Sequence, residues 1–176
     1  MLNDASNRAD SLVVRTAATA DFGAILRLNA AWVRFTSALD EASLTHLHAQ
    51  SALFRVVESG GEVAAFLIAL REGADYGSPN YRWFGQRGGA FLCIDRVVVD
   101  GAAQGRGIAR TLYDEVVALA REAGVARITC ELDIVPPNEG SRRFHDAYGF
   151  REVGTQWVAG GTKQVSLREL EISPAD

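Results

Sequence analysis

The sequence lacks the features that define membrane, secreted and nucleic-acid-binding proteins. No apolar run approaches the roughly 20 residues that cross a bilayer, and the N-terminal residues do not form the basic-then-apolar pattern of a secretory signal. Acidic residues outnumber basic ones by 22 to 18, a net charge of -4, whereas binding to a phosphate backbone requires a basic surface. We therefore expect a cytoplasmic protein that binds neither membranes nor nucleic acids.

Cysteine is also scarce, with only Cys93 and Cys130 in the chain. Each lies in an apolar, strand-like run, and neither belongs to a Cys-x-x-Cys pair or a spacing that could bind a metal. We expect both to be small buried side chains, and we expect neither a disulfide nor a metal site.

The chain has the length of one domain and no internal repeats. Its changes of hydrophobic period predict a strand, two helices, three strands, a helix, a strand, a helix and two strands. This order favours an α/β (α+β) fold over residues 11–171, with a mixed twisted sheet of about seven strands and about four helices. Residues 1–10 are expected to be disordered, and residues 172–176 to form a C-terminal tail.

A glycine-rich turn follows the apolar strand at 90–99 and precedes a helix beginning near Ile108. Free backbone N–H groups at a helix start favour an anion, and Gly105 and Gly107 would let phosphate oxygens approach the backbone. The P-loop signature Gly-Lys-Ser/Thr is absent, and Arg110 occupies the position where a dinucleotide fingerprint needs a small residue. A plain connection with two glycines is the alternative.

The turn contains Gln104, Gly107 and Ala109, which match the Gln/Arg-x-x-Gly-x-Gly/Ala signature of the GNAT superfamily of acetyl-coenzyme A-dependent transferases. The order of strands and the segment 138–150 are also similar to this family. The resemblance implies that acetyl-coenzyme A is the donor and that the sheet splays between strands 90–99 and 126–132. It implies that the donor is bound by Val97, Val98, Val99, Gln104, Gly105, Arg106, Gly107, Ile108 and Ala109.

Acetyl transfer to an amine needs removal of a proton from the amine, stabilisation of the carbonyl oxygen and a proton for the thiolate. Asp95 is at a position where many family members carry an acidic residue, so we consider it as the base. The alternative is a structural carboxylate. An ion pair with Arg96 is disfavoured, because adjacent strand residues point to opposite faces.

The predicted helix at 138–148 places Asn138, Ser141, His145 and Tyr148 on one face. In the family pattern Asn-x6-Tyr-x3-Gly-Phe, the tyrosine is the acid, and His145 stands at that position here. The sequence resembles the phosphinothricin-acetyltransferase-like branch, which implies that Asn138 and Ser141 contact the cofactor. His145 is then a candidate acid or base, Tyr148 is a second candidate acid, and a histidine without a chemical task is the alternative.

Residues 71–89 are expected to form a long loop, because they combine several glycines, a proline and aromatic residues. Four of its aromatic residues are candidates for the wall of the acceptor site: Tyr76, Tyr81, Trp83 and Phe84. A loop packed by its own rings is the alternative. Glu72 and Asp75 would suit a cationic amine, whereas Arg82 and Arg87 would suit an acceptor with a carboxylate.

The resemblance as a whole implies an N-acetyltransferase that acts on a primary amine of a small molecule by direct attack in a ternary complex. Acetylation of a peptide and a non-catalytic acyl-coenzyme A-binding module are the alternatives. The family also suggests a homodimer.

Overall fold

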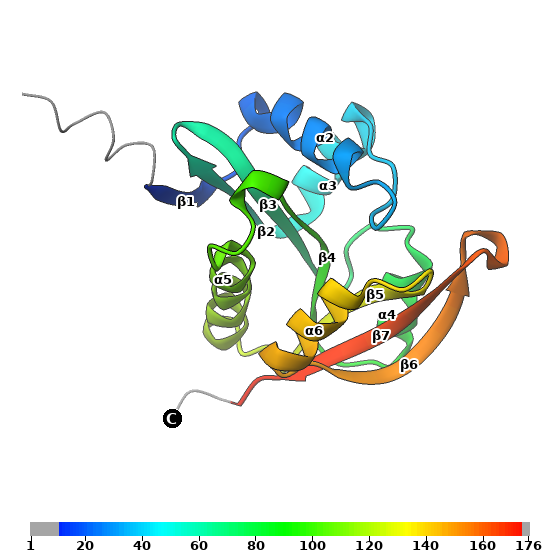
Figure 1. Ribbon diagram of the computed structural model, residues 1–176. Coiled ribbons are helices and arrows are strands. Elements are labelled where there is room, and N and C mark those ends of the chain that lie inside the picture. The colour runs from blue at the N-terminus through cyan, green and yellow to red at the C-terminus, as the bar shows by residue number, and fades with distance from the viewer. Residues whose placement is uncertain (1–10, 174–176) are drawn as a thin grey trace, which may run out of the picture.

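The computed structural model describes residues 11–173 and contains one seven-stranded mixed sheet with the strand order β1-β2-β3-β4-β5-β7-β6 (Figure 1). The expected domain ends at 1–10 and 174–176 lie outside the described residues. The strands are β1 (Leu12–Thr16), β2 (Ser51–Ser59), β3 (Glu62–Arg71), β4 (Leu92–Val99), β5 (Arg127–Val135), β6 (Arg151–Val158) and β7 (Lys163–Glu171). The helices are α2 (Phe22–Ala31), α3 (Glu41–Gln50), α4 (Pro79–Gln86), α5 (Ile108–Glu122) and α6 (Glu139–Tyr148).

The helices cover both faces of the sheet. Buried side chains of α2, α3 and α4 pack with Phe66, Ile68 and Val98 in one cluster, whereas those of α5 pack with Leu67 and Ile94 in a second cluster on the opposite face. The α6 side chains join the second cluster. In Figure 1, α2 lies near the top of the view, and α5 and α6 lie in its lower half. The fold therefore has three layers, with the sheet in the middle.

β4 and β5 are the only parallel neighbours among the described strands, and they pair over a short length. Their register contains only Leu92 with Ile128 and Cys93 with Thr129, after which the two strands separate. Every other pair of neighbouring strands is antiparallel and pairs over at least five residues. The predicted splay between these two strands is confirmed, and it opens a passage between the two faces of the sheet.

The expectation of a long loop at 71–89 is wrong, because this segment contains the helix α4. Its start carries two signals that favour a helix, since Ser78 Oγ accepts a hydrogen bond from Tyr81 N and Pro79 is the first helical residue. The described residues therefore contain five helices rather than about four. The C-terminal tail begins with ordered structure, because Ile172 is buried and its N donates to Ala126 O at 2.8 Å.

None of the helices within residues 11–173 has the length and apolar character required to cross a membrane.

Candidate active site

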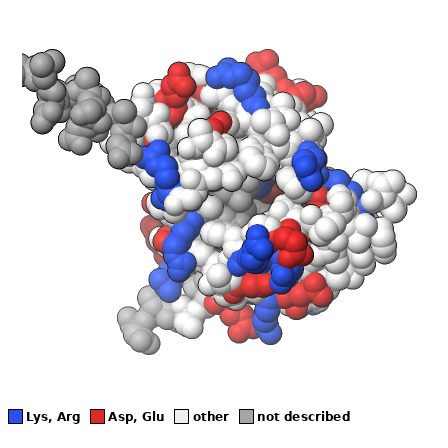
Figure 2. Space-filling model, in the orientation of Figure 1, with Lys and Arg blue, Asp and Glu red and all other residues white. Residues whose placement is uncertain are grey.

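A cavity of about 1140 Å³ occupies the gap between β4 and β5. Its lining comes from both faces of the sheet, with Trp32 and Tyr76 on the α2 side and Gly107 and Ser141 on the α5 and α6 side. Figure 2 shows the hollow near the centre of this face of the molecule. Two substrates could therefore enter from opposite faces and meet at the level of the sheet.

The turn before α5 leaves backbone N–H groups exposed at one end of the cavity. Gly105 and Gly107 adopt φ values of +77° and +76°, which residues with a Cβ rarely adopt. No side chain caps the first turn of α5, so the N–H groups at Ile108 and Ala109 have no partner within the helix. These residues and Gln104 line the cavity, whereas Arg106 directs its guanidinium to Ser59 Oγ at 2.8 Å.

The open edge of β4 presents backbone groups of Val97 and Val99 to the gap. Asp100 N donates to Ala64 O at 2.8 Å, and hydrogen bonding in an antiparallel pair alternates along the strand. The N–H and C=O groups of Val97 and Val99 therefore point away from β3, while those of Val98 point toward β3. Val99 O accepts from Gln104 Nε2 at 3.5 Å, in agreement with this direction.

Asp95 and Arg96 form an ion pair, which corrects the expectation that their side chains point to opposite faces. The register between β3 and β4 shifts at this point, so Asp95 is an extra residue in β4 and the alternation of faces is interrupted. Asp95 Oδ2 lies 2.6 Å from Arg96 Nε, and each side chain is 5% exposed. The Tyr76 hydroxyl donates to Asp95 Oδ1, and burial together with this carboxylate raises the pKa of Tyr76 well above its ordinary range.

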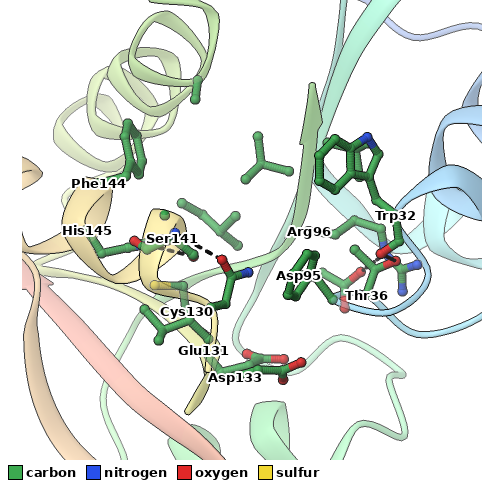
Figure 3. Close-up of a pocket in the computed structure, with 18 of the residues that line it drawn as sticks. Trp32, Thr36, Asp95, Arg96, Cys130, Glu131, Asp133, Ser141, Phe144 and His145 are labelled. Carbon is green, nitrogen blue, oxygen red and sulfur yellow. Dashed lines mark hydrogen bonds and ion pairs between the residues drawn. The ribbon is translucent and has the colours of Figure 1, made fainter. Parts of the chain in front are cut away.

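Glu131 on β5 also lines the cavity, and it is not among the residues expected at the site from the sequence. Burial and the neighbouring carboxylate of Asp95 raise the pKa of Glu131 to about 8, and the Asn80 amide acts in the opposite direction. Asn80 Oδ1 accepts from Gln156 Nε2 at 3.0 Å, which orients the Asn80 NH2 group toward Glu131. In Figure 3, Glu131, Asp95 and Asp133 lie near one another.

Asp133 lies two residues beyond Glu131 and is 8% exposed. Its Oδ2 lies 3.0 Å from Lys163 Nζ, which also donates to Arg34 O at 2.9 Å. Thus Asp95 and Asp133 each have a cationic partner. No arginine or lysine within the described part of the chain forms an ion pair with Glu131.

His145 is buried on α6, and hydrogen bonds occupy both of its ring nitrogens. Its Nδ1 lies 2.7 Å from Ser141 O, and because a backbone carbonyl only accepts, Nδ1 carries the proton. Nε2 then accepts from the Tyr113 hydroxyl at 2.8 Å. Burial lowers the pKa of His145, so its neutral form is favoured. Ser141 Oγ lies 3.2 Å from Nδ1 and accepts from it, which leaves the Ser141 O–H able to donate toward the cavity.

Two other predicted residues, Tyr148 at the end of α6 and Asn138 at its N-cap, form contacts with neighbouring structure. The Tyr148 hydroxyl donates to Asp114 Oδ1 at 2.6 Å, and its ring lies beneath the guanidinium of Arg110. Asn138 Oδ1 accepts from Ser141 N at 3.1 Å and caps the helix. Both Tyr148 and Asn138 line the cavity.

The aromatic residues expected at an acceptor site separate into two groups. Tyr76 lines the cavity, whereas Tyr81 and Phe84 are buried in the core with exposed fractions of 6% and 0%. Trp83 packs on Gly154 of β6, where an added Cβ would lie 2.7 Å from the indole ring. Trp32 and Phe35, between α2 and α3, line the cavity instead, although neither was expected at the acceptor site.

Within residues 11–173, no group of three or more His, Cys, Asp or Glu side chains is arranged to hold a metal ion.

The family model described as the acetyltransferase (GNAT) family matches residues 21–150. The chain therefore belongs to this family. It is an acyltransferase whose donor is acetyl-coenzyme A. A search of curated proteins gives no match.

Solved structures show the same fold. The ribosomal-protein-S18-alanine N-acetyltransferase of Escherichia coli is 18% identical, with a TM-score of 0.70 and coverage of 94% of this chain and 97% of that one. The Salmonella typhimurium protein yncA, solved with its cofactor acetyl-CoA, is 19% identical, with a TM-score of 0.70 and coverage of 95% and 97%. Arabidopsis thaliana NAA60, solved with a bisubstrate analogue, is 14% identical, with a TM-score of 0.74 and coverage of 94% and 100%.

Proposed function

We propose that this protein transfers an acetyl group from acetyl-coenzyme A to a primary amine of a small molecule, by direct attack in a ternary complex. The observation that carries the proposal is Glu131, a carboxyl group that forms no ion pair with any cation among residues 11–173 and lies where the cavity passes through the sheet. An acceptor amine would enter from the face covered by α2 and α4.

The residues present fit the donor. The N–H groups at the start of α5 and the glycines at 105 and 107 suit a diphosphate. The backbone of Val97 and Val99 has polar groups along the gap that no described strand pairs with, and these suit the amide groups of a pantetheine arm. Acetyl-coenzyme A supplies an activated acyl carbon and a thiolate leaving group. Gln104, Ile108, Ala109, Asn138 and Ser141 border the same part of the cavity.

Glu131 is proposed to accept the proton of the attacking amine. A pKa near 8 lets its carboxylate take a proton near neutral pH and also lose it again. Asp95 is the alternative base, but both of its oxygens already accept hydrogen bonds, from Tyr76 and from Arg96. The N–H groups of Val97 and Val99 are candidates to stabilise the oxygen of the tetrahedral intermediate.

The Ser141 hydroxyl is proposed to donate to the departing sulfur. His145 acts through it as a positioning residue, because Nδ1–H donates to both oxygens of Ser141 and so leaves the hydroxyl proton for the cavity. The Tyr113 hydroxyl on Nε2 fixes this tautomer. Tyr148 has a lesser role in this arrangement, because its hydroxyl donates to Asp114.

The test is release of free thiol from acetyl-coenzyme A in the presence of a panel of small amines and, separately, of peptides. We expect turnover with small amines, and we expect Glu131→Gln to reduce kcat/KM by about 10²-fold or more while Asp95→Asn, if folded, retains more activity. When kcat/KM of the wild type is plotted against pH, it should rise with a midpoint near pH 8, and this rise should be absent from Glu131→Gln. Ionisation of the acceptor amine affects both pH profiles equally, so the difference between them reports Glu131 alone. Turnover with peptides alone would contradict the small-molecule assignment, and equal activity of wild type and Glu131→Gln would remove Glu131 as the base.

A further inference from the structure

Lys163 is the only lysine of the chain, and it lies in the lining of the active-site cavity. It is the first residue of β7, and its side chain is 28% exposed. Its ammonium group bridges Asp133 Oδ2 and the backbone oxygen of Arg34, which lies in the segment after α2. The proposed chemistry does not use this group.

Glu131 and Asp133 form two successive carboxyl positions along one strand. They are separated by one residue, and the register between β5 and β7 is regular across them, so their side chains lie on the same face. Their partners across the sheet are Leu167 and Val165, which belong to the core on the α2 side. At about 3.3 Å per residue, the two positions are about 7 Å apart along the strand.

Only one of these two positions is open to a cationic ligand. The ammonium of Lys163 occupies Asp133, while Glu131 has no cationic partner in the described chain. A monoamine bound at Glu131 has no second ammonium group to bring near the charge of Lys163 at Asp133. A diamine with nitrogens about 7 Å apart would bring its second ammonium to Asp133, where it would meet the charge of Lys163 within a few ångströms. Like charges at that distance oppose binding strongly in a half-buried site.

We propose that Lys163 is a specificity-determining residue that makes the site select monoamines and reject diamines. This inference rests on the proposed function, because it requires that the acceptor amine binds at Glu131. Removal of the ammonium group frees the carboxylate of Asp133, and the site then offers two carboxyl groups with the spacing of a short diamine.

The experiment compares n-butylamine with 1,4-diaminobutane as acceptors for the wild type, Lys163→Met and Lys163→Arg. In the wild type, kcat/KM should favour the monoamine. Lys163→Met should shift the ratio toward the diamine by about tenfold or more, and Lys163→Arg, which keeps the charge, should retain the wild-type preference. The double variant Lys163→Met/Asp133→Asn should lose the gain, because it has no second carboxylate. Thermal unfolding of each variant establishes that it folds.

A ratio that stays unchanged in folded Lys163→Met would overturn the proposal, as would a gain that persists in the double variant. Calorimetric titration of the two amines into protein saturated with coenzyme A gives a readout without turnover. Tighter binding of the diamine by Lys163→Met than by the wild type supports the role of Lys163 even if neither amine is acetylated, and no such gain contradicts it. If neither amine caused release of thiol, the proposed acceptor class would be contradicted instead. Failure of the proposed function is thus distinguishable from failure of the proposed role of Lys163.

Discussion

Asp95 and Arg96 are neighbours in the chain, yet their side chains lie on the same face of β4 and form a buried ion pair of 2.6 Å. The irregular register at Asp95 makes this arrangement possible. Arg96 also donates to Asn29 Oδ1 at 2.9 Å and to Ser37 Oγ at 3.0 Å, so the pair connects β4 to α2 and to the segment that follows it. The ion pair therefore supports the wall of the cavity as well as the strand.

Arg96→Met should destabilise the protein by about 3 to 5 kcal/mol, because it leaves the Asp95 carboxylate buried without a cationic partner. Removing both charges in Asp95→Asn/Arg96→Met should cost less than Arg96→Met alone. Urea denaturation measures both free energies of unfolding. A double variant that is less stable than the single variant would contradict this account of the pair.

Gly107→Val should weaken binding of acetyl-coenzyme A by at least about tenfold. A β-branched residue is strained at the φ of +76°, and its side chain would stand in the turn that presents the N–H groups. Gly101→Ala is the matched control, because Gly101 has no positive φ and an added Cβ there meets no atom within 4 Å. Calorimetry should show near wild-type affinity for the control, and equal affinity of all three proteins would exclude the turn as the diphosphate site.

Ser141→Ala and His145→Ala should each lower kcat by about tenfold, and the double variant should be no worse than His145→Ala. This follows if His145 acts through the Ser141 hydroxyl. Tyr148→Phe should change kcat by less than about threefold, because its hydroxyl is engaged with Asp114. The measurement is kcat of each variant from steady-state kinetics at saturating concentrations of both substrates. A larger loss in Tyr148→Phe, or additive losses at Ser141 and His145, would reverse the assignment.

Glu131→Gln should be more stable than the wild type at pH 9 and nearly equal to it at pH 5. The folded-state pKa of Glu131, near 8, exceeds the ordinary value of 4.5, so the native state favours the protonated form. That contribution is complete below pH 4.5 and is lost as the pH rises through 8. Asp95 and Asp133 raise this pKa, while Arg96 and Asn80 lower it. Melting temperatures across this pH range give the measurement.

The exposed Glu139→Gln is the control for that series, since Glu139 pairs with Arg142 at the start of α6 and its pKa is lowered rather than raised. If Glu131→Gln showed no gain in stability between pH 5 and pH 9, burial of an unpaired carboxyl at this position would be contradicted.

The order of strands and the glycine turn were predictable because local patterns determine them. The alternation in the strands and the glycines at 105 and 107 each depend on nearby residues. The helix α4 was missed although Ser78 and Pro79 together mark a helix start, because the surrounding glycines and aromatic residues favoured a loop. The assignment of its rings to the acceptor site followed from that loop, whereas the structure places Tyr81 and Phe84 in the core.

The group of carboxyl side chains in the cavity, Asp95, Glu131 and Asp133, was harder to predict, because it depends on which distant strands become neighbours. Glu131 does carry a local signal, since it is the single carboxylate in the strand-like segment 125–132. Its partners Asn80 and Asp95 come from other elements, and the irregular register that turns Asp95 toward Arg96 has no local signature in β4. The pairing of Lys163 with Asp133 likewise depends on the register between β5 and β7.

The most direct test of the account is diffraction from crystals grown with coenzyme A. We expect density for the diphosphate at the turn formed by residues 104–109 and for the pantetheine between β4 and β5, with its thiol directed toward Glu131. Coenzyme A bound elsewhere on the protein, or β4 and β5 hydrogen-bonded along their full lengths with the turn empty, would contradict the proposed site.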